Sequence, residues 1–273
     1  MVNSSHDLPF TMNILPSLRN VLLLALALFV GSLAAASAPA ATIAYSIDFD
    51  GDNQSFPSDW LRGMDGANGV NGLIEENGLG QLVMQRLSSG TAGAPLAALF
   101  NDSAGGFEAN AFADVTLRTT VQFNGGNGDK HGLLARTQIV SQNPTGYYAY
   151  FTNATLVISK NPQTSSETIL ESTAISGLTA LANYTLEFSL SGHLLVANLF
   201  ASGGETPLFS ISTTDESYSQ GYVGLRSRIA NQNRMVAYDS FELQVIPEPG
   251  TTALLFLGIP LLYTLTRTAR NRC

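Results

Sequence analysis

The sequence predicts an all-β domain, a sandwich or a barrel, for the body of the chain at residues 42–246. Apolar and polar residues alternate with period two at 115–123 and 184–190, the pattern of strands with one buried and one wet face. Turn-forming residues separate such segments at spacings of about 8–12 residues, which is typical of sandwiches and barrels. No stretch of the body has the length and periodicity of an ordinary helix. The length of the body, residues 42–246, fits one domain.

The body divides into further strand candidates separated by turns. Gly, Asn, Pro and Ser gather at 124–128, 143–144, 191–192 and 202–204, where we expect the chain to reverse. Besides the two alternating segments, the candidates are 44–49, 81–86, 96–100, 132–138, 147–152, 156–160, 168–171, 194–200, 208–212, 222–226 and 235–245.

The N-terminus has the layout of a secretory signal peptide. A ten-residue apolar core at 21–30 follows Arg19 and is followed by small residues, and it is too short to span a membrane. We predict a signal peptide at 1–36, cleaved after Ala36, with translation starting at Met1 or Met12.

The C-terminus at 247–273 holds a marginal membrane anchor. The apolar run at 253–265 spans about 20 Å as a helix, short of the roughly 30 Å hydrocarbon core. The motif Pro247, Glu248 and Pro249 precedes the run, and the basic tail Arg267, Arg270 and Arg272 follows it. This order resembles the PEP-CTERM sorting signal of Gram-negative bacteria. The resemblance implies a transient inner-membrane anchor handled by an exosortase, and a destination at the cell surface or in the extracellular polysaccharide matrix. The alternative is an ordinary C-terminal tail anchor.

The charge and the cysteine count narrow the function classes. The chain carries a net charge of −8 at pH 7, which argues against nucleic acid as a partner. Its single cysteine, Cys273, lies in the tail, so the body has no disulfide, thiol nucleophile or thiolate metal ligand.

A second resemblance covers nearly the whole body. The segments that carry it, in order, are Ile47-Asp48-Phe49-Asp50, Trp60, 132–136, 146–150 with 156–160, 184–188 with Gly192, 221–226 and 237–241. They resemble the concanavalin-like, laminin-G-like jelly roll. The resemblance implies two stacked antiparallel sheets of six or seven strands, with the first and last strands, around 47–49 and 238–243, side by side.

Carboxylates at the two ends of the body are candidate calcium ligands. Asp48, Asp50, Asp52 and Asp59 have the spacing of a calcium loop, but Asn53 stands where that loop needs glycine. Asp239 shares the strand parity of Phe241 unless a bulge intervenes, and a carboxylate there needs a partner. Many jelly rolls of this type carry a structural calcium near the terminal strands. We therefore expect either calcium held by Asp239 with Asp48 or Asp50, or a plain hydrogen-bonded Asp239.

Catalysis has little support in the sequence. No strand carries the spaced carboxylate pair of jelly-roll glycosidases. Glu167 and Glu171 share a parity but resemble a solvated edge, and His131 falls in a glycine-rich turn without a nucleophile pattern.

Aromatic residues favour glycan binding instead. Tyr148 and Tyr150 should share one face of a strand, with Tyr147 on the other face, and Trp60 and Arg136 are possible neighbours. The leading hypothesis is a non-enzymatic surface or matrix protein that binds glycan, with the exopolysaccharide of its own cell as one candidate ligand. The alternatives are a glycan-degrading jelly-roll hydrolase and a structural matrix protein without a ligand.

Overall fold

The computed structural model describes residues 42–49, 60–63, 72–86, 95–100, 112–126, 128–138, 145–162, 166–230 and 234–246. The predicted signal peptide, the predicted sorting signal and Asp50 lie outside these ranges. Every regular element in the described residues is a β-strand, and all of them belong to the compact unit Ala41–Cys273. No helix long and apolar enough to cross a membrane is found within those ranges.

Fifteen strands lie within the described residues. They are β1 (Thr42–Ile47), β2 (Trp60–Gly63), β3 (Gly72–Asn77), β4 (Gln81–Arg86), β5 (Pro95–Phe100), β6 (Val115–Gln122), β7 (Lys130–Gln138), β8 (Thr145–Phe151), β9 (Thr155–Lys160), β10 (Thr168–Ala174), β11 (Asn183–Ser191), β12 (Leu194–Ala201), β13 (Phe209–Thr214), β14 (Tyr222–Arg228) and β15 (Met235–Val245). All the predicted strands are present, and β2 and β3 are additional.

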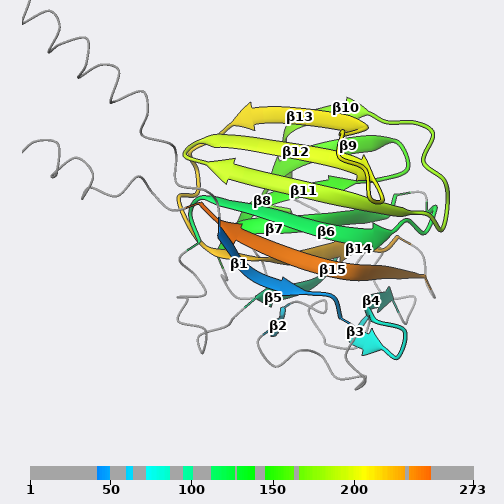
Figure 1. Cartoon of the computed structure of the whole chain (residues 1–273). Coiled ribbons are helices and arrows are strands. Elements are labelled where there is room, and N and C mark those ends of the chain that lie inside the picture. Colours follow the sequence, from blue (N-terminus) through cyan, green and yellow to red (C-terminus); the bar gives the residue numbers. More distant parts are fainter. Residues whose placement is uncertain are drawn as a thin grey trace, which may run out of the picture. The chain divides into compact units, whose positions relative to one another are not determined.

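The strands form two stacked antiparallel sheets (Figure 1). The eight-stranded sheet has the order β13-β12-β11-β6-β15-β4-β3, with β1 also paired to β15. The seven-stranded sheet has the order β10-β9-β8-β7-β14-β5-β2. The prediction of an all-β, two-sheet fold is confirmed.

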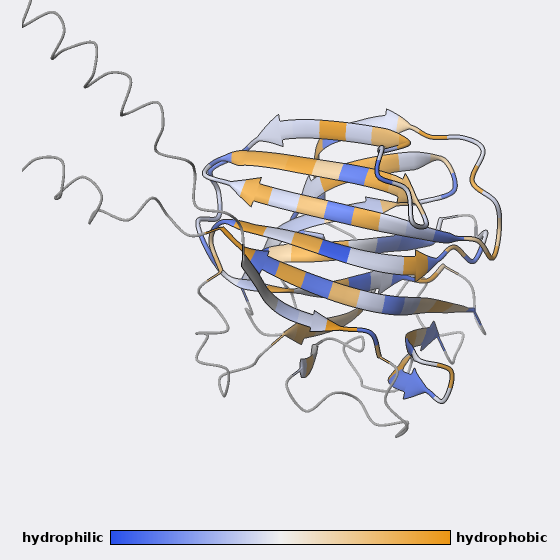
Figure 2. Cartoon of the chain, in the orientation of Figure 1, coloured by the Kyte–Doolittle hydropathy of each residue, from blue (hydrophilic) through white to orange (hydrophobic). Residues whose placement is uncertain are grey.

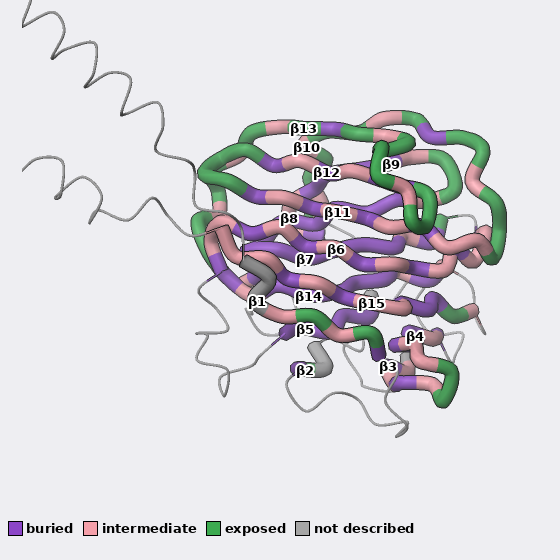
Figure 3. The backbone as a smooth tube through the Cα atoms, viewed as in Figure 1, coloured by how far each residue is buried: buried purple, intermediate pink, exposed green. Residues whose placement is uncertain are grey.

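Period-two alternation places the core between the sheets. Along β6 and β11 buried and partly exposed residues alternate without a break, and the same banding is visible in hydropathy and in burial (Figures 2 and 3). Leu117 and Phe188, paired across these strands, are fully buried. Their burial removes large apolar side chains from water, which is the main term that stabilises such a sandwich.

The first and last strands of the body are neighbours. β1 pairs antiparallel with β15, and Ile47 lies opposite Phe241. The pairing that the jelly-roll resemblance implied is therefore present. β1 pairs with residues 241–245 of β15, and β4 pairs with residues 235–238. Together the two strands cover one edge of β15.

Trp60 fills the core beneath these terminal strands. Its side chain is only 4% exposed, and its ring meets that of Phe241 edge-on at 4.9 Å. The indole Nε1 donates a hydrogen bond to the Tyr45 hydroxyl at 3.1 Å, which satisfies its one polar group. Trp60 thus anchors the short strand β2 to the core.

His131 is a core residue as well. The sequence indicated a glycine-rich turn, but His131 is the second residue of β7 and is fully buried. Its ring lies between those of Phe123 and Phe151, at 5.8 and 5.3 Å, and neither ring nitrogen has a hydrogen-bond partner. Burial lowers the pKa of His131 to about 4.

Candidate functional site

The outer face of the seven-stranded sheet carries a second cluster of buried side chains. Tyr148 and Tyr150 of β8 belong to it, whereas Tyr147 and Phe151 belong to the main core. This separation confirms the parity that the sequence predicted for β8. The other buried members of the outer cluster are Ala97, Leu99, Leu134 and Val157.

The two tyrosine rings stack on each other. Their centroids are 4.7 Å apart and their planes are tilted by 28°. The ring of Tyr148 occupies the space above Gly132, where an added Cβ would lie 2.6 Å from a Tyr148 ring carbon. Glycine at this position of β7 therefore lets Tyr148 lean across the strand, and the Tyr148 hydroxyl donates a hydrogen bond to the Arg226 carbonyl of β14 at 3.0 Å.

Two cations cover the stacked rings. The Arg226 guanidinium carbon lies 4.9 Å from the centroid of Tyr148, and Lys130 Nζ lies 4.3 Å from that of Tyr150. Both distances are within the range of cation–π attraction. Lys130 also forms an ion pair with Glu167, whose other carboxylate oxygen accepts a hydrogen bond from Ser159 Oγ at 2.9 Å. We call Tyr148, Tyr150, Lys130, Glu167, Arg226 and Arg228 the tyrosine–cation face.

Burial sets the protonation behaviour of this face. It lowers the pKa of Lys130, although Glu167 opposes the shift, and it lowers the pKa of Arg226. Burial raises the pKa of both Tyr148 and Tyr150, so their hydroxyls stay protonated as hydrogen-bond donors. Burial alone would raise the pKa of Glu167, but the hydrogen bond and charge of Lys130 outweigh it, and the pKa is lowered.

The rings of this face are not an open platform. Tyr148 is fully buried and Tyr150 is 4% exposed, whereas the side chains of Lys130 and Glu167 are 14% and 15% exposed. The Lys130–Glu167 pair is therefore the solvent-facing rim of the cluster. A ligand that contacts the rings has to displace this pair or the groups beside it.

Trp60 and Arg136 do not join this face. Trp60 points into the core, as described above. Arg136 bonds the carbonyls of Ala113 and Tyr218 at 2.9 and 3.0 Å and pairs with Asp114 at 3.1 Å. Its backbone φ is +47°, and the pairing of β7 with β8 shifts register at this point. Both side chains are almost fully buried with structural partners, which disfavours a ligand contact by either one.

Asp239 lies at a β-bulge rather than on the apolar parity of β15. The pairing of β15 with β6 shifts between Tyr238 and Ser240, and this shift turns Asp239 away from the core. Its Oδ1 accepts a hydrogen bond from Gln81 Nε2 and its Oδ2 one from Asn183 Nδ2, both at 2.6 Å. Asp48 is exposed at the end of β1. In the described ranges, no group of three or more His, Cys, Asp or Glu side chains is placed to hold a metal ion.

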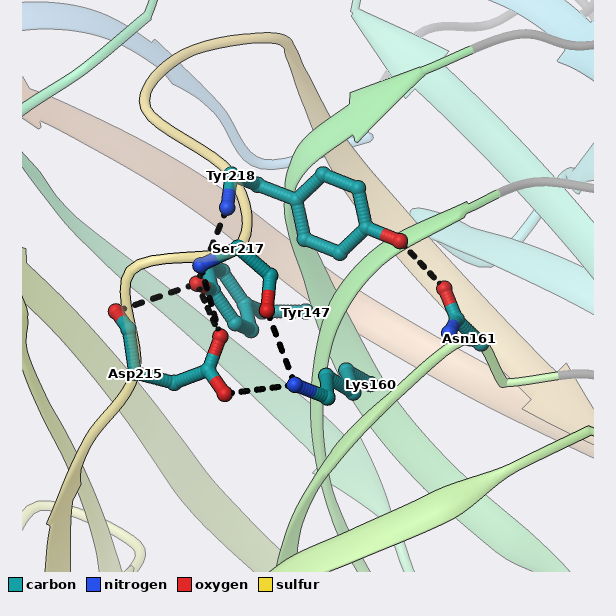
Figure 4. A network of polar contacts seen from close by, with 6 residues as sticks. All are labelled: Tyr147, Lys160, Asn161, Asp215, Ser217 and Tyr218. Atoms are coloured by element: carbon teal, nitrogen blue, oxygen red, sulfur yellow. Dashed lines mark hydrogen bonds and ion pairs between the residues drawn. The ribbon is translucent and has the colours of Figure 1, made fainter.

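A second polar network ties the loop after β13 to the ends of β8 and β9 (Figure 4). Asp215 is at its centre: Oδ1 accepts from the Tyr147 hydroxyl at 2.7 Å and Oδ2 from Lys160 Nζ at 2.6 Å. Burial alone would raise the pKa of Asp215, but the hydrogen bonds from Lys160 and Ser217 hold it well below its usual range. Burial and the bond to Asp215 raise the pKa of Tyr147 to about 12. A permanently ionised, fully bonded carboxylate of this kind fastens a loop and does not serve as a proton donor.

Four residues of the tyrosine–cation face were not predicted from the sequence. Lys130, Arg226 and Arg228 were not singled out, and Glu167 was expected at a solvated edge. A signal for the arginines was present: Gly224, Arg226 and Arg228 alternate with the apolar residues of β14 and so share its outer face. The position of Glu167 depends on the packing of the chain before β10 against β7 and β9, which no local pattern reveals.

Solved structures match this fold at low sequence identity. The exoplasmic/lumenal domain of VIP36 in its Ca²⁺/Man3GlcNAc-bound form has a TM-score of 0.52 and 12% identity, covering 77% of this chain and 92% of that chain. The Ca²⁺/Man-bound form of the same domain has a TM-score of 0.51 and 13% identity, covering 76% and 93%. A Bacillus subtilis protein of unknown function with a galectin-like fold has a TM-score of 0.50 and 10% identity, covering 74% and 96%. No protein-family model and no curated protein matches the sequence. The likeness shows a jelly-roll, galectin-like fold.

Proposed function

We propose that this protein is a non-enzymatic glycan-binding protein and that it binds its ligand on the tyrosine–cation face. The observation that carries the proposal is the stacked pair Tyr148 and Tyr150 with Arg226 and Lys130 placed over the rings. Aromatic faces pack against the apolar faces of sugar rings, and charged donors nearby bond sugar hydroxyls. The fold supports the proposal, because VIP36 has been solved with mannose and with Man3GlcNAc bound.

The ligand enters from the solvent-facing rim in this proposal. Lys130 covers the ring of Tyr150 and is itself only partly exposed. When the ligand displaces the Lys130–Glu167 pair from the ring, the aromatic surface becomes available and Lys130 remains close enough to donate to the ligand. The pair thus protects an apolar surface that would otherwise be exposed in the free protein.

The two carboxylates that are paired with lysines, Glu167 and Asp215, favour binding over hydrolysis. A glycosidase needs one carboxylic acid whose pKa is raised, so that it can protonate the leaving oxygen. Glu167 and Asp215 are each paired with a lysine, and the pKa of each is lowered. A jelly-roll hydrolase is therefore the second candidate, and a structural matrix protein without a ligand is the third.

The terminal segments place the protein outside the cell in this proposal. A signal peptide at 1–36 directs export, and an exosortase processes the tail that begins at Pro247, releasing the body to the cell surface or the extracellular matrix of a Gram-negative bacterium. Mass spectrometry of the native product should show a chain that starts near Ser37 and lacks the segment 267–273. An intact tail in the mature protein would contradict the sorting proposal.

A glycan array probed with the full chain tests the binding proposal. We expect binding to a defined glycan class, and we expect Tyr150→Leu to weaken it about tenfold or more because the stacking surface is lost. Phe200→Leu is the matched control: Phe200 is also a buried aromatic residue beneath a cation, Arg118 at 5.6 Å, but it lies in the eight-stranded sheet. Absence of binding to any glycan, or equal losses in both variants, would refute the proposal.

A further inference from the structure

The tyrosine–cation face carries an excess of positive charge on an acidic protein. The whole chain has a net charge of −8 at pH 7. On this face, however, the described residues place three cations close together: Arg226 and Arg228 help to lower the pKa of Lys130, and Arg228 helps to lower that of Arg226. Glu167 is the carboxylate that pairs with Lys130. The local charge is therefore opposite in sign to that of the chain.

The sheet register brings two of these cations directly opposite each other. Lys130 of β7 pairs with Arg228 of β14, and Arg226 pairs with Gly132. Like charges on directly opposed strand positions destabilise a sheet. Glu167 opposes this repulsion through the ion pair with Lys130 described above, and its charge also favours the charged form of Arg226.

The two arginines also keep hydrogen-bond donors unused. Arg226 is 2% exposed, and both its Nε and the Nε of Arg228 are buried without a hydrogen-bond partner. A buried charged donor that lacks an acceptor costs more than an ordinary unsatisfied group. Arg226 and Arg228 are two residues apart on one strand, so their side chains leave the same face of the sheet roughly 7 Å apart.

We propose that the glycan bound on this face carries an anionic group, a carboxylate or a sulfate, which lies between Lys130, Arg226 and Arg228. This inference rests on the proposed glycan-binding function. The anion accepts hydrogen bonds from the unpartnered arginine Nε–H groups and takes the place of the Glu167 carboxylate at Lys130. Planar guanidinium groups suit carboxylate and sulfate oxygens, and charge-assisted hydrogen bonds of this kind are about twice as strong as neutral ones.

The test compares acidic glycans with neutral counterparts on the full chain. The probes are alginate, polygalacturonate and hyaluronate, each beside its carboxyl-reduced form, and dextran sulfate beside dextran, measured by titration calorimetry at low and physiological salt. We expect at least one acidic probe to bind about tenfold or more tightly than its neutral form, with affinity falling as salt rises. The polyuronates and dextran sulfate separate a carboxylate ligand from a sulfate ligand.

Charge variants identify the face that is responsible. Arg226→Gln and Arg228→Gln should each weaken acidic binding about tenfold, while Glu167→Gln should strengthen it because the competing carboxylate is gone. The matched controls are Arg118→Gln and Glu187→Gln, which break a similar ion pair, at 3.5 Å, on the eight-stranded sheet and should leave binding unchanged. Urea unfolding of each variant checks the fold, and Arg228→Gln with Glu167→Gln decides the question if Arg226→Gln is too unstable to assay.

Each outcome decides between the two proposals. Equal affinity for acidic and neutral glycans, with binding lost in Tyr150→Leu, would overturn the anionic ligand and leave glycan binding in place. Acidic binding that Glu167→Gln does not strengthen and neither arginine variant weakens would also overturn the inference. No binding to any probe or to the glycan array would overturn both proposals together.

Discussion

Lowering the pH should destabilise the sandwich through His131. This imidazole is fully buried between two phenylalanine rings and has no hydrogen-bond partner for either nitrogen. Burial lowers its pKa from an ordinary value of 6.5 to about 4, a shift that the charge of Asp129 only partly opposes. The folded protein therefore holds His131 neutral at pH values where the unfolded chain has already bound a proton.

The size of the effect follows from the pKa difference. Above pH 6.5 both states are neutral at His131 and the residue adds no pH dependence. As the pH falls below 6.5 the unfolded chain binds the proton first, so stability decreases until the pH reaches the folded pKa. Each pKa unit corresponds to about 1.4 kcal/mol, which gives a loss of about 2 kcal/mol at pH 5 and about 3 kcal/mol at pH 4.

Urea unfolding between pH 4 and 7.5 measures this loss. We expect His131→Leu, which removes the titrating group at similar volume, to lie within about 1.5 kcal/mol of the unmodified protein at pH 7.5. At pH 5 the variant should have gained about 2 kcal/mol relative to the unmodified protein. His193→Leu, at an exposed turn position, is the control and should keep the original pH dependence. If the unmodified protein and His131→Leu lose the same stability between pH 7.5 and 5, His131 does not cause the pH dependence.

Three further changes test the packing. Phe188→Ala removes a fully buried side chain and should lower the free energy of unfolding in urea by about 3–5 kcal/mol. Glu187→Ala, at a side chain that is 20% exposed, should lower it by about 1 kcal/mol or less. A larger loss for Glu187→Ala than for Phe188→Ala would contradict the register of β11. Gly132→Ala should lower the free energy of unfolding by more than about 2 kcal/mol, because the new Cβ would lie 2.2 Å from a backbone oxygen. Gly78→Ala, whose Cβ would have no atom within 4 Å, is the control and should lower it by less than about 1 kcal/mol. Equal losses in the two variants would show that β7 relaxes freely. Asp239→Ala should lower the free energy of unfolding by about 1–3 kcal/mol, and by the same amount in calcium and in EDTA, because side-chain amides already bond both carboxylate oxygens. A melting temperature that rises with calcium only when Asp239 is present would instead establish a calcium site.

The strands could be predicted from the sequence where one face is buried and the other is wet. In segments such as 115–122 and 183–191 every second residue is buried and nearly all of these residues are apolar, so the period-two pattern alone identifies the strand. β2 and β3 were not predicted. β2 has four residues, too few for a period, and β3 contains the adjacent acids Glu75 and Glu76, of which Glu76 is buried by tertiary packing.

The candidate site could be predicted only in part, because bulges and long-range packing decide the rest. Parity identified the shared face of Tyr148 and Tyr150 correctly. Parity alone does not position a side chain where the ladder is irregular: a bulge turns Asp239 out of the core, and Arg136, which has a left-handed backbone conformation, bonds structural partners. Neither Asp239 nor Arg136 is a glycine or a proline, so the sequence carries no local signal of the irregular backbone there.

The contrast between the two outer faces of the sandwich supports the proposed position of the ligand. On the eight-stranded sheet Arg118 pairs with Glu187, which also accepts a hydrogen bond from Asn198 at 3.0 Å, and the hydroxyls of Thr120 and Thr185 bond each other at 3.1 Å. In the described residues, no buried side-chain nitrogen or oxygen without a hydrogen-bond partner lies on β6, β11, β12 or β13. In the seven-stranded sheet β7 contributes three such atoms, on His131 and Thr137, and β14 contributes two, both on arginines of the tyrosine–cation face. Both sheets share one apolar core, to which Arg226 and Arg228 do not belong. The Arg226 guanidinium packs on the Tyr148 ring, but the Nε atoms of Arg226 and Arg228 have no acceptor among the described residues, and we propose that the ligand supplies it.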